Sequence, residues 1–472
     1  MVVKMTYKKT IAMKLLFLLA ISLLLQGCFV AKNYERPEVL DEAQFRTDML
    51  PKDSTSLGEI SWKTLFTDQQ LAKYIEQGLQ NNIDIRVALQ QLEIAKAYYK
   101  QGKAGYLPDL NVRGQVTHQE LSGNSQFGSI FDGSITQYEL TGNLAWEADI
   151  WGKIRSGKRA SEAAYLQTAA AHQAVKTQLI ANIATVYYRL LMLDAQLEIV
   201  EQTIQNRSNS LETTKLLKDA GILTEVAVKQ TEAQLNTAEG LKLDIKRDIH
   251  QTENLFSILL GSPVQKIKRG SLDSQTLTTD LNTGFPTQLL SNRPDVIAAE
   301  YQLVEAFELT NIARSNFYPS LGITATTGFQ SLDLDQLLNA NSLFATFVGS
   351  LVQPLLNGRR IRSEFEASEA RQEIAYLQFR QALLTAGREV SDAMYAYKTA
   401  EEKIKFKTKE FEAYALASDY SEELLDSGFI NYLEVLIARE NTLNAEVQLA
   451  TIKFEKLQAL VELYRALGGG ME

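Results

Sequence analysis

The chain has 472 residues, of which 45% are hydrophobic and 22% charged, so it is long enough for more than one folded domain. Its formal net charge is −9 and no basic stripe stands out, which argues against nucleic acid as a partner. The 3 histidines are widely separated and no HExxH, GxSxG or P-loop motif occurs. The sequence therefore predicts no enzyme and no cofactor site.

The amino terminus carries a targeting signal. Several lysines precede the apolar run at 15–25, and LQGC (25–28) follows it. This order is typical of a secretory signal peptide, because so short an apolar stretch cannot cross a bilayer as a helix. We expect cleavage before Cys28, the only cysteine, and acylation of its thiol; the alternative is an incidental buried thiol. Phe29, in place of the aspartate that retains lipoproteins at the inner membrane, indicates the outer membrane.

The chain resembles itself at two offsets. NNIDIRVALQQLEIA (81–95) matches NRPDVIAAEYQLVEA (292–306) at an offset of 211, and DAG (219–221) matches DSG (426–428) at an offset of 207. The offset changes after Pro108, which places the difference in a loop. Two offsets in the same chain order predict a tandem duplication.

Each repeat contains a segment of period two. In ITQYELTGNLAWEADIW (135–151), Tyr138 and Trp146 lie on an apolar face and the intervening residues are mostly polar. Such strands suit a soluble sheet or a membrane. Four strands cannot close a barrel in lipid, so other copies must pair with the edges, and three copies would give twelve strands around an open lumen. We expect Tyr138, Trp146 and Trp151 at the membrane interfaces.

Long heptad patterns follow the strands. From Leu179 to Leu211 apolar residues recur at spacings of four and three, with one lapse at Arg207. A continuous helix over 154–216 would be about 90 Å long, and it is too charged to face lipid. We expect it to project into the periplasm.

The predicted organisation follows the repeats. In chain order it is a signal peptide (1–27), a lipidated extended segment (28–66), repeat 1 (67–261, with a helix at roughly 68–103, a β-hairpin at about 109–150 and a long helix pair at about 153–260), an equatorial linker (262–291), repeat 2 (292–467, with a helix, a β-hairpin at about 319–354 and a long helix pair at about 358–466) and a C-terminal tail (468–472).

The chain resembles the outer-membrane factor family of TolC/OprM-type channels, specifically its lipoprotein branch. The resemblance covers residues 28–467, and the segments that carry it are LQGC (25–28), NNIDIRVA (81–88), GYLPDL (105–110), WEADIWGKIRSG (146–157), NRPDVIAAE (292–300), FYPSL (317–321) and QPLLNGRRIR (353–362). It implies a mixed, mainly α fold, in which a tandem-duplicated unit gives a trimeric 12-stranded transmembrane β-barrel continuous with a long periplasmic α-helical coiled-coil barrel.

The resemblance also implies a function and partners. A homotrimer in the Gram-negative outer membrane, lipid-anchored and in contact with its lipid, would be the passive exit duct of a tripartite efflux system for small molecules. Its partners would be a periplasmic adaptor and an inner-membrane transporter of the resistance–nodulation–division type. The alternatives are the outer-membrane channel of a type I protein secretion system and a lipid-anchored coiled-coil scaffold.

Two glycine-centred corners are candidate sites. Gly221 and Gly428 are expected to end helices in the left-handed conformation, and the resemblance places both corners at the periplasmic tips. Asp219 and Asp426 would contact the adaptor there or simply cap the helices. Asn431 or Thr224 can begin the next helix.

The resemblance further implies an acidic periplasmic gate. Glu434, six residues after Gly428, occupies the position of a gate carboxylate, with Asn431 nearby. Ile437 stands where another acidic gate residue can occur, so the chain departs from the family pattern there. The alternative for Glu434 is a solvated glutamate on a helix surface.

Overall fold

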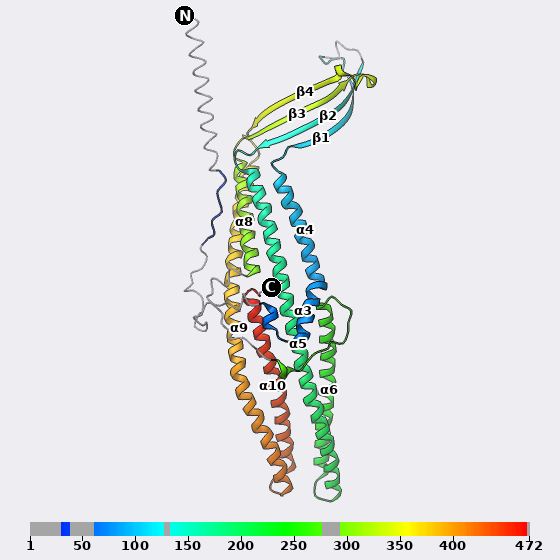
Figure 1. The fold of residues 1–472 in the computed structure, drawn as a ribbon, viewed down its shortest axis with the longest axis vertical. Helices are drawn as coiled ribbons and strands as arrows, with labels where there is room; N and C mark the ends of the chain where they lie inside the picture. Colours follow the sequence, from blue (N-terminus) through cyan, green and yellow to red (C-terminus); the bar gives the residue numbers. More distant parts are fainter. Residues whose placement is uncertain (1–29, 38–60, 127–132, 276–292, 470–472) are drawn as a thin grey trace. The chain divides into compact units, whose positions relative to one another are not determined.

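The computed structural model describes residues 30–37, 61–126, 133–275 and 293–469 (Figure 1). The predicted signal peptide, Cys28 and the end of the 262–291 linker lie outside the described residues. Contacts divide the described chain into two compact units. The first unit takes in residues 30–37, 93–167 and 299–378, as far as they are described, and the second takes in the remaining described residues.

Helices account for most of the described residues. The elements are α2 (Trp62–Leu65), α3 (Gln69–Asn81), α4 (Ile83–Ala104), β1 (Asp109–Glu120), β2 (Ser134–Ala148), α5 (Lys153–Asp219), α6 (Glu225–Leu259), α8 (Pro294–Ser315), β3 (Ser320–Ser331), β4 (Leu343–Val352), α9 (Arg360–Asp426) and α10 (Tyr432–Ala466), with short 3₁₀ turns η4 (Leu272–Ser274), η5 (Leu334–Gln336) and η6 (Ala340–Ser342). None of the described helices combines the length and the apolar character that crossing a bilayer requires.

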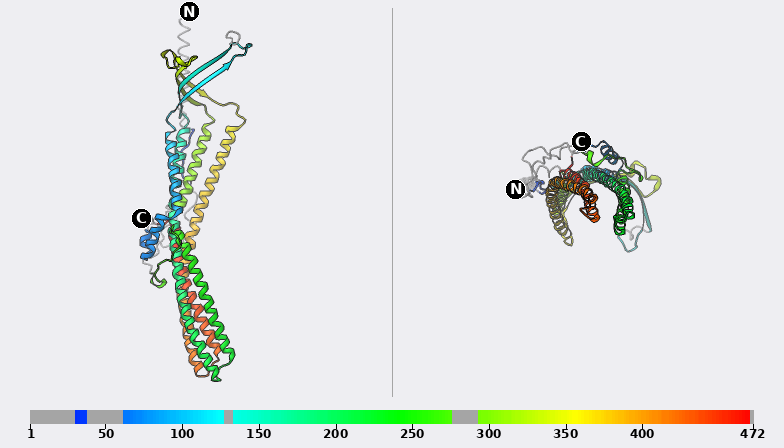
Figure 2. Two further views of the ribbon diagram at one scale, coloured as in Figure 1. Left: turned by 90° about the vertical axis from the view of Figure 1, so that its right-hand side faces the viewer. Right: turned by 90° about the horizontal axis from the view of Figure 1, so that it is seen from below.

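The element bounds follow the two sequence offsets. Those of α4 and β1 recur in α8 and β3 with a shift of 211 residues, and those of α5 and α6 recur in α9 and α10 with a shift of 207. As a result α5 and α9 both have 67 residues, and α6 and α10 both have 35. Figures 1 and 2 show α6 running beside the later part of α5, and α10 beside the later part of α9.

The prediction of a single helix over 68–103 is wrong, because the helix is interrupted at Asn82 and two helices, α3 and α4, form instead. Asn82 is buried in an extended conformation with φ −57° and ψ 134°. Its side-chain oxygen accepts hydrogen bonds from the amides of Asp84 and Ile85, at 2.9 and 3.2 Å, and so begins α4. Its side-chain amide donates to the carbonyl of Leu259 at 3.0 Å. This tertiary bond to α6 fixes the break, and the helical periodicity did not predict it.

The four strands of the first unit form one antiparallel sheet in the order β1-β2-β3-β4 (Figure 1). Each pair is in register over most of its length: Val112 lies opposite Gly142, Asn143 opposite Thr326, and Ala325 opposite Phe347. Within the described chain, β1 and β4 each have one neighbour, so each leaves one edge of the sheet unpaired.

The second unit has a large apolar core with many aromatic rings. Phe66 packs edge-on against Tyr464 with ring centroids 5.6 Å apart, and Tyr74 packs edge-on against Phe256 at 5.1 Å. Tyr187, wholly buried, donates to the Asp68 carboxylate at 2.9 Å. The core takes residues from α2, α3, α5, α6, α9 and α10, so it ties the two long helix pairs together in this unit.

Candidate functional site: the two-faced sheet and the helix corners

One face of the sheet is polar. The register places these side chains on it: Arg113, Gln115, Glu139, Thr141, Asn143, Thr326 and Gln330. Hydrogen bonds cross the strands on this face, because Gln330 donates to Glu139 at 3.0 Å and Thr326 donates to Asn143 at 3.0 Å. The polar groups are thus ordered into a row that runs across β2 and β3, and such a row suits contact with water.

The opposite face is apolar and exposed. Its large side chains that are exposed in the single copy are Leu110, Val112, Val116, Leu140, Trp146, Ile323, Leu343, Phe347 and Leu351. Phe347, for example, is 79% exposed. A contiguous apolar surface of this kind is rare on soluble monomers and marks contact with protein or membrane.

The three predicted interface aromatics lie in different surroundings. Tyr138 and Trp146 project on the apolar face of β2, and the indole N–H of Trp146 donates to the carbonyl of Tyr106 at 3.0 Å. Trp151 follows the strand; its N–H donates to the carbonyl of Pro319 at 2.7 Å, and its ring stacks on Tyr318 with centroids 4.9 Å apart. Trp151 therefore also has a packing role at the end of the sheet.

The two helix corners, residues 220–224 (first corner) and 427–431 (second corner), share one geometry. Gly221 and Gly428 have φ of 78° and 75°, so the predicted left-handed caps are confirmed. The amide of each glycine donates three residues back, at 2.9 Å, and the amide of the next residue, Ile222 or Phe429, donates five residues back, also at 2.9 Å. This is the Schellman pattern, which satisfies the last carbonyls of α5 and α9.

The candidate gate residues lie at the start of α10. The Asn431 side chain accepts hydrogen bonds from the amides of Leu433 and Glu434, so Asn431 is the N-cap of α10. Glu434 is exposed in the first helical turn, and its carboxylate accepts from the Asn431 side-chain amide at 3.3 Å. At the first corner the Thr224 side chain accepts from the amide of Ala227 and so caps α6.

The two tip aspartates end their helices. Asp219 is the last residue of α5 and its side chain is 70% exposed, within 3.0 Å of Lys218. Asp426 is the last residue of α9, and its side chain lies outside what the structure describes. The exposed position of Asp219 leaves it accessible to another protein.

A buried polar cluster near the corners was not predicted from the sequence. Arg207, the lapse in the heptad pattern, is 3% exposed. It donates to the carbonyl of Gln234 on α6 at 2.6 Å and to the Glu440 carboxylate on α10 at 2.7 Å. Closer to the corner, Thr214 and Thr231 donate to the Tyr432 hydroxyl at 3.1 and 3.0 Å. The lapse at Arg207 was the signal, but its partners lie 27 and 233 residues away.

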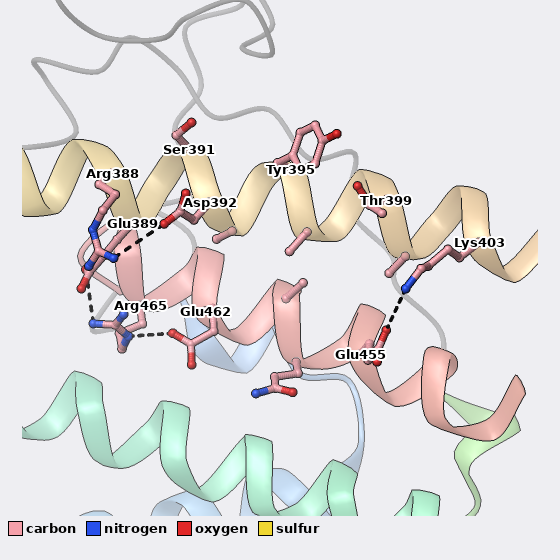
Figure 3. Close-up of a pocket in the computed structure, with 15 residues that line it drawn as sticks. Arg388, Glu389, Ser391, Asp392, Tyr395, Thr399, Lys403, Glu455, Glu462 and Arg465 are labelled. Atoms are coloured by element: carbon pink, nitrogen blue, oxygen red, sulfur yellow. Dashed lines mark hydrogen bonds and ion pairs between the residues drawn. The ribbon is translucent and has the colours of Figure 1, made fainter. Parts of the chain in front are cut away.

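A groove of about 880 Å³ lies between α9 and α10 (Figure 3). Arg465 bridges Glu389 at 3.4 Å and Glu462 at 2.9 Å, and Lys403 lies 3.9 Å from Glu455. Because these charges are joined in pairs, the groove offers no concentrated charge to a ligand.

Comparison with known proteins agrees with this geometry. A family model described as outer membrane efflux protein matches residues 74–262 and 285–469. The chain is 29% identical over 455 residues to the solvent efflux pump outer membrane protein SrpC of Pseudomonas putida, which covers 95% of this chain and 96% of that protein. It is 27% identical over 455 residues to the cation efflux system protein CusC of Escherichia coli K12, with coverage of 95% and 98%.

A solved structure gives the same result. The outer membrane protein VceC from Vibrio cholerae superposes with a TM-score of 0.81 at 26% identity, covering 87% of this chain and 98% of that chain. The two matched stretches together make up most of the sequence. The chain belongs to the outer membrane efflux protein family.

Proposed function

We propose that three copies of this chain form the outer-membrane exit duct of a tripartite efflux pump. The observation that carries the proposal is the sheet, which has one apolar face, one polar face and two unpaired edges. In lipid an unpaired edge is too costly to persist, so β1 of one copy pairs with β4 of the next. Three four-stranded sheets close a barrel of twelve strands, apolar outside and polar inside, with an open lumen.

The tandem duplication is part of the proposal. Element bounds that recur at 211 and 207 residues support two copies of one unit, each with a hairpin and a long helix pair. Three chains then bring six helix pairs to the periplasmic barrel and six corners to its tip. Within the barrel wall Tyr138 and Trp146 would lie at the lipid face, with Trp151 at its lower boundary.

The corners suit contact with a periplasmic adaptor. Ile222 and Phe429, one at each corner, are 69% and 79% exposed, and Asp219 and Asp426 each stand three residues before them. Exposed apolar side chains at both tips fit a protein partner. The inner-membrane transporter, of the resistance–nodulation–division type, would couple through this adaptor.

Glu434 is the proposed gate residue. Because it is exposed at the start of α10 and held by Asn431, three copies would set three carboxylates around the axis at the tip. Such a ring repels anions and retains cations. Ile437, 52% exposed, adds no second charge.

Acylation of Cys28 would hold the amino terminus at the membrane. The cargo is proposed only as small molecules, since the named relatives belong to a solvent pump and to a cation system. No observation favours protein secretion, and a coiled-coil scaffold has no use for a sheet with one apolar face.

Conductance in planar bilayers tests this function. We expect the purified protein to form cation-preferring channels, and Glu434→Ala to raise conductance and weaken the cation preference. Glu225→Ala, which removes an exposed acid from the first turn of α6 at the other corner, serves as the control and should leave both unchanged. Purified protein without any conductance would overturn the channel, whereas a Glu434→Ala variant identical to the parent would remove only the gate assignment.

A further inference from the structure

The connector between β4 and α9 exposes two adjacent leucines. Leu355 is 88% exposed and Leu356 is 99% exposed, more than any other large apolar side chain in the described chain. They follow Leu351, a residue of the apolar face of β4 that is 66% exposed. Exposed apolar side chains therefore continue along the chain from β4 into this connector.

Three arginines follow the leucines within six residues, after Asn357 and Gly358. Arg359 and Arg362 have side chains that are 65% and 70% exposed, and both bind the single carboxylate of Glu366 at 3.1 Å. Arg360 is exposed and makes no ion pair within the described residues. Arg359 also has φ of 65°, a left-handed conformation that disfavours any residue but glycine. The segment 353–362 thus carries three arginines and no carboxylate of its own, and Arg360 lines a pocket that also contains Glu147, Asp149 and Glu364.

The matching connector of the first repeat is built differently. At the offset of 207, Asp149 corresponds to Leu356 and Gly152 to Arg359. The Asp149 carboxylate accepts from the amides of Ile154 and Arg155 at 2.9 and 2.8 Å, and Gly152 takes the left-handed conformation at no cost in strain. In the first connector the acid bonds to nearby backbone amides, whereas the second presents apolar and cationic groups outward.

We propose that the β4–α9 connector is a docking site for phospholipid headgroups of the periplasmic leaflet. In it Leu355 and Leu356 enter the hydrocarbon edge, and Arg359, Arg360 and Arg362 bind lipid phosphates. The inference rests on the proposed function, because it requires the apolar face of the sheet to lie in the membrane. The order along the chain, apolar strand, leucine pair, arginines, reproduces the order of a bilayer from hydrocarbon to phosphate.

A second copy of the chain is the competing occupant. The α4–β1 connector exposes Leu107, which is 68% exposed and lies at the foot of the other edge strand. Such a contact would account for the leucines. It would not account for the three arginines, two of which share the carboxylate of Glu366. A lipid phosphate would supply the negative charge that these arginines lack.

Lipid-dependent stabilisation of the purified protein tests the proposal. The probes are dioctanoyl phosphatidylglycerol, dioctanoyl phosphatidylcholine and inorganic phosphate, each added to the detergent-solubilised protein during thermal unfolding. We expect phosphatidylglycerol to raise the unfolding midpoint most. Its apparent affinity should fall about fivefold for each arginine replaced in Arg359→Gln/Arg360→Gln/Arg362→Gln. Leu355→Ser/Leu356→Ser should weaken the binding of both lipids.

The control removes three other arginines. Arg86→Gln/Arg371→Gln/Arg380→Gln takes away the same charge from exposed helix positions and should keep the native lipid response. Equal stabilisation by inorganic phosphate, or a native response in the connector variants, overturns the proposal. So does a leucine variant that loses its trimer in detergent with lipid affinity intact, since that result assigns the connector to a neighbouring copy.

Two further measurements separate a failure of the headgroup site from a failure of the proposed function. If the triple arginine variant does not fold, the single variant Arg360→Gln must still show the fivefold loss. Channel conductance of each variant is recorded alongside. Intact conductance with an unchanged lipid response refutes the headgroup site alone, whereas absence of conductance in the parent protein refutes the proposed function.

Discussion

Arg207 stands where the heptad of α5 calls for an apolar side chain. Its neighbours one and two heptads earlier, Val200 and Leu193, are buried against Ile245 and Leu443 in an apolar cluster. At Arg207 this contact between α5, α6 and α10 becomes polar, with one charged pair and one backbone acceptor. A buried charge at a core position fixes which helices meet and in what register.

Replacing Arg207 should therefore be costly. We expect Arg207→Ala to destabilise the protein by about 3 kcal/mol, at the low end for a broken buried pair, because the partly exposed Glu440 can regain water. The thermal unfolding midpoint of the detergent-solubilised protein measures this. Arg189→Ala, an exposed arginine on the same helix, should change stability by about 0.5 kcal/mol or less. Equal effects from the two variants would show that the buried pair is unimportant.

At the scale of elements, the corners show how local chemistry ends a helix. The added Cβ of an alanine at Gly221, Gly428 or Gly240 would meet no atom within 4 Å, so any effect of such a substitution comes from the backbone. Gly221 and Gly428 are left-handed, whereas Gly240 lies inside α6. The same substitution therefore has opposite consequences at the two kinds of site.

We expect Gly221→Ala and Gly428→Ala each to destabilise the protein by about 1 kcal/mol. Gly240→Ala should stabilise it by about 0.5–1 kcal/mol, since alanine loses less backbone entropy within a helix. Urea or thermal unfolding of the three variants under one set of conditions measures both signs. Destabilisation by Gly240→Ala would contradict the explanation from backbone conformation.

The sequence predicted elements whose signals are local. Alternation over 135–151 predicted β2, and glycine followed by a capping residue predicted both corners. The helix interruption at Asn82 was not predicted, because it depends on a contact between residues far apart in the sequence. In a helical pattern an asparagine is unremarkable, and it breaks the chain because its amide reaches Leu259, 177 residues away. Arg207 depends on distant contacts in the same way. The sequence shows that it interrupts the heptad pattern, but not which residues it binds.

At the scale of the whole molecule, the number of strands decides how the sheet can close. The sequence predicted four strands and a signal for export to the membrane. In the structure the four strands form one sheet, with a free edge on β1 and another on β4. Neither the sequence pattern nor the fold of a single copy contains the strand pairing that would cover these two edges. The proposed number of copies rests on lumen size: eight strands give an interior filled by side chains, and twelve leave room for a passage.

Cysteine pairs across the two edges would count the copies directly. Val112 on β1 and alternate residues of β4 lie on the same face of the sheet, so Val112→Cys is combined in turn with cysteine at Leu343, Ala345, Phe347 or Gly349. Disulfides need Cβ atoms about 4 Å apart, so only the pair in the correct register should react on oxidation.

We expect that pair to give a covalent product of three chains on a non-reducing gel, with dimers as intermediates. Each single-cysteine variant is its control and also reports whether Cys28 retains a free thiol, which acylation would remove. A ladder that stops at two chains would indicate an eight-stranded barrel too narrow for a duct. No product at any register would mean that β1 and β4 of neighbouring copies do not meet, and the threefold channel would have to be abandoned.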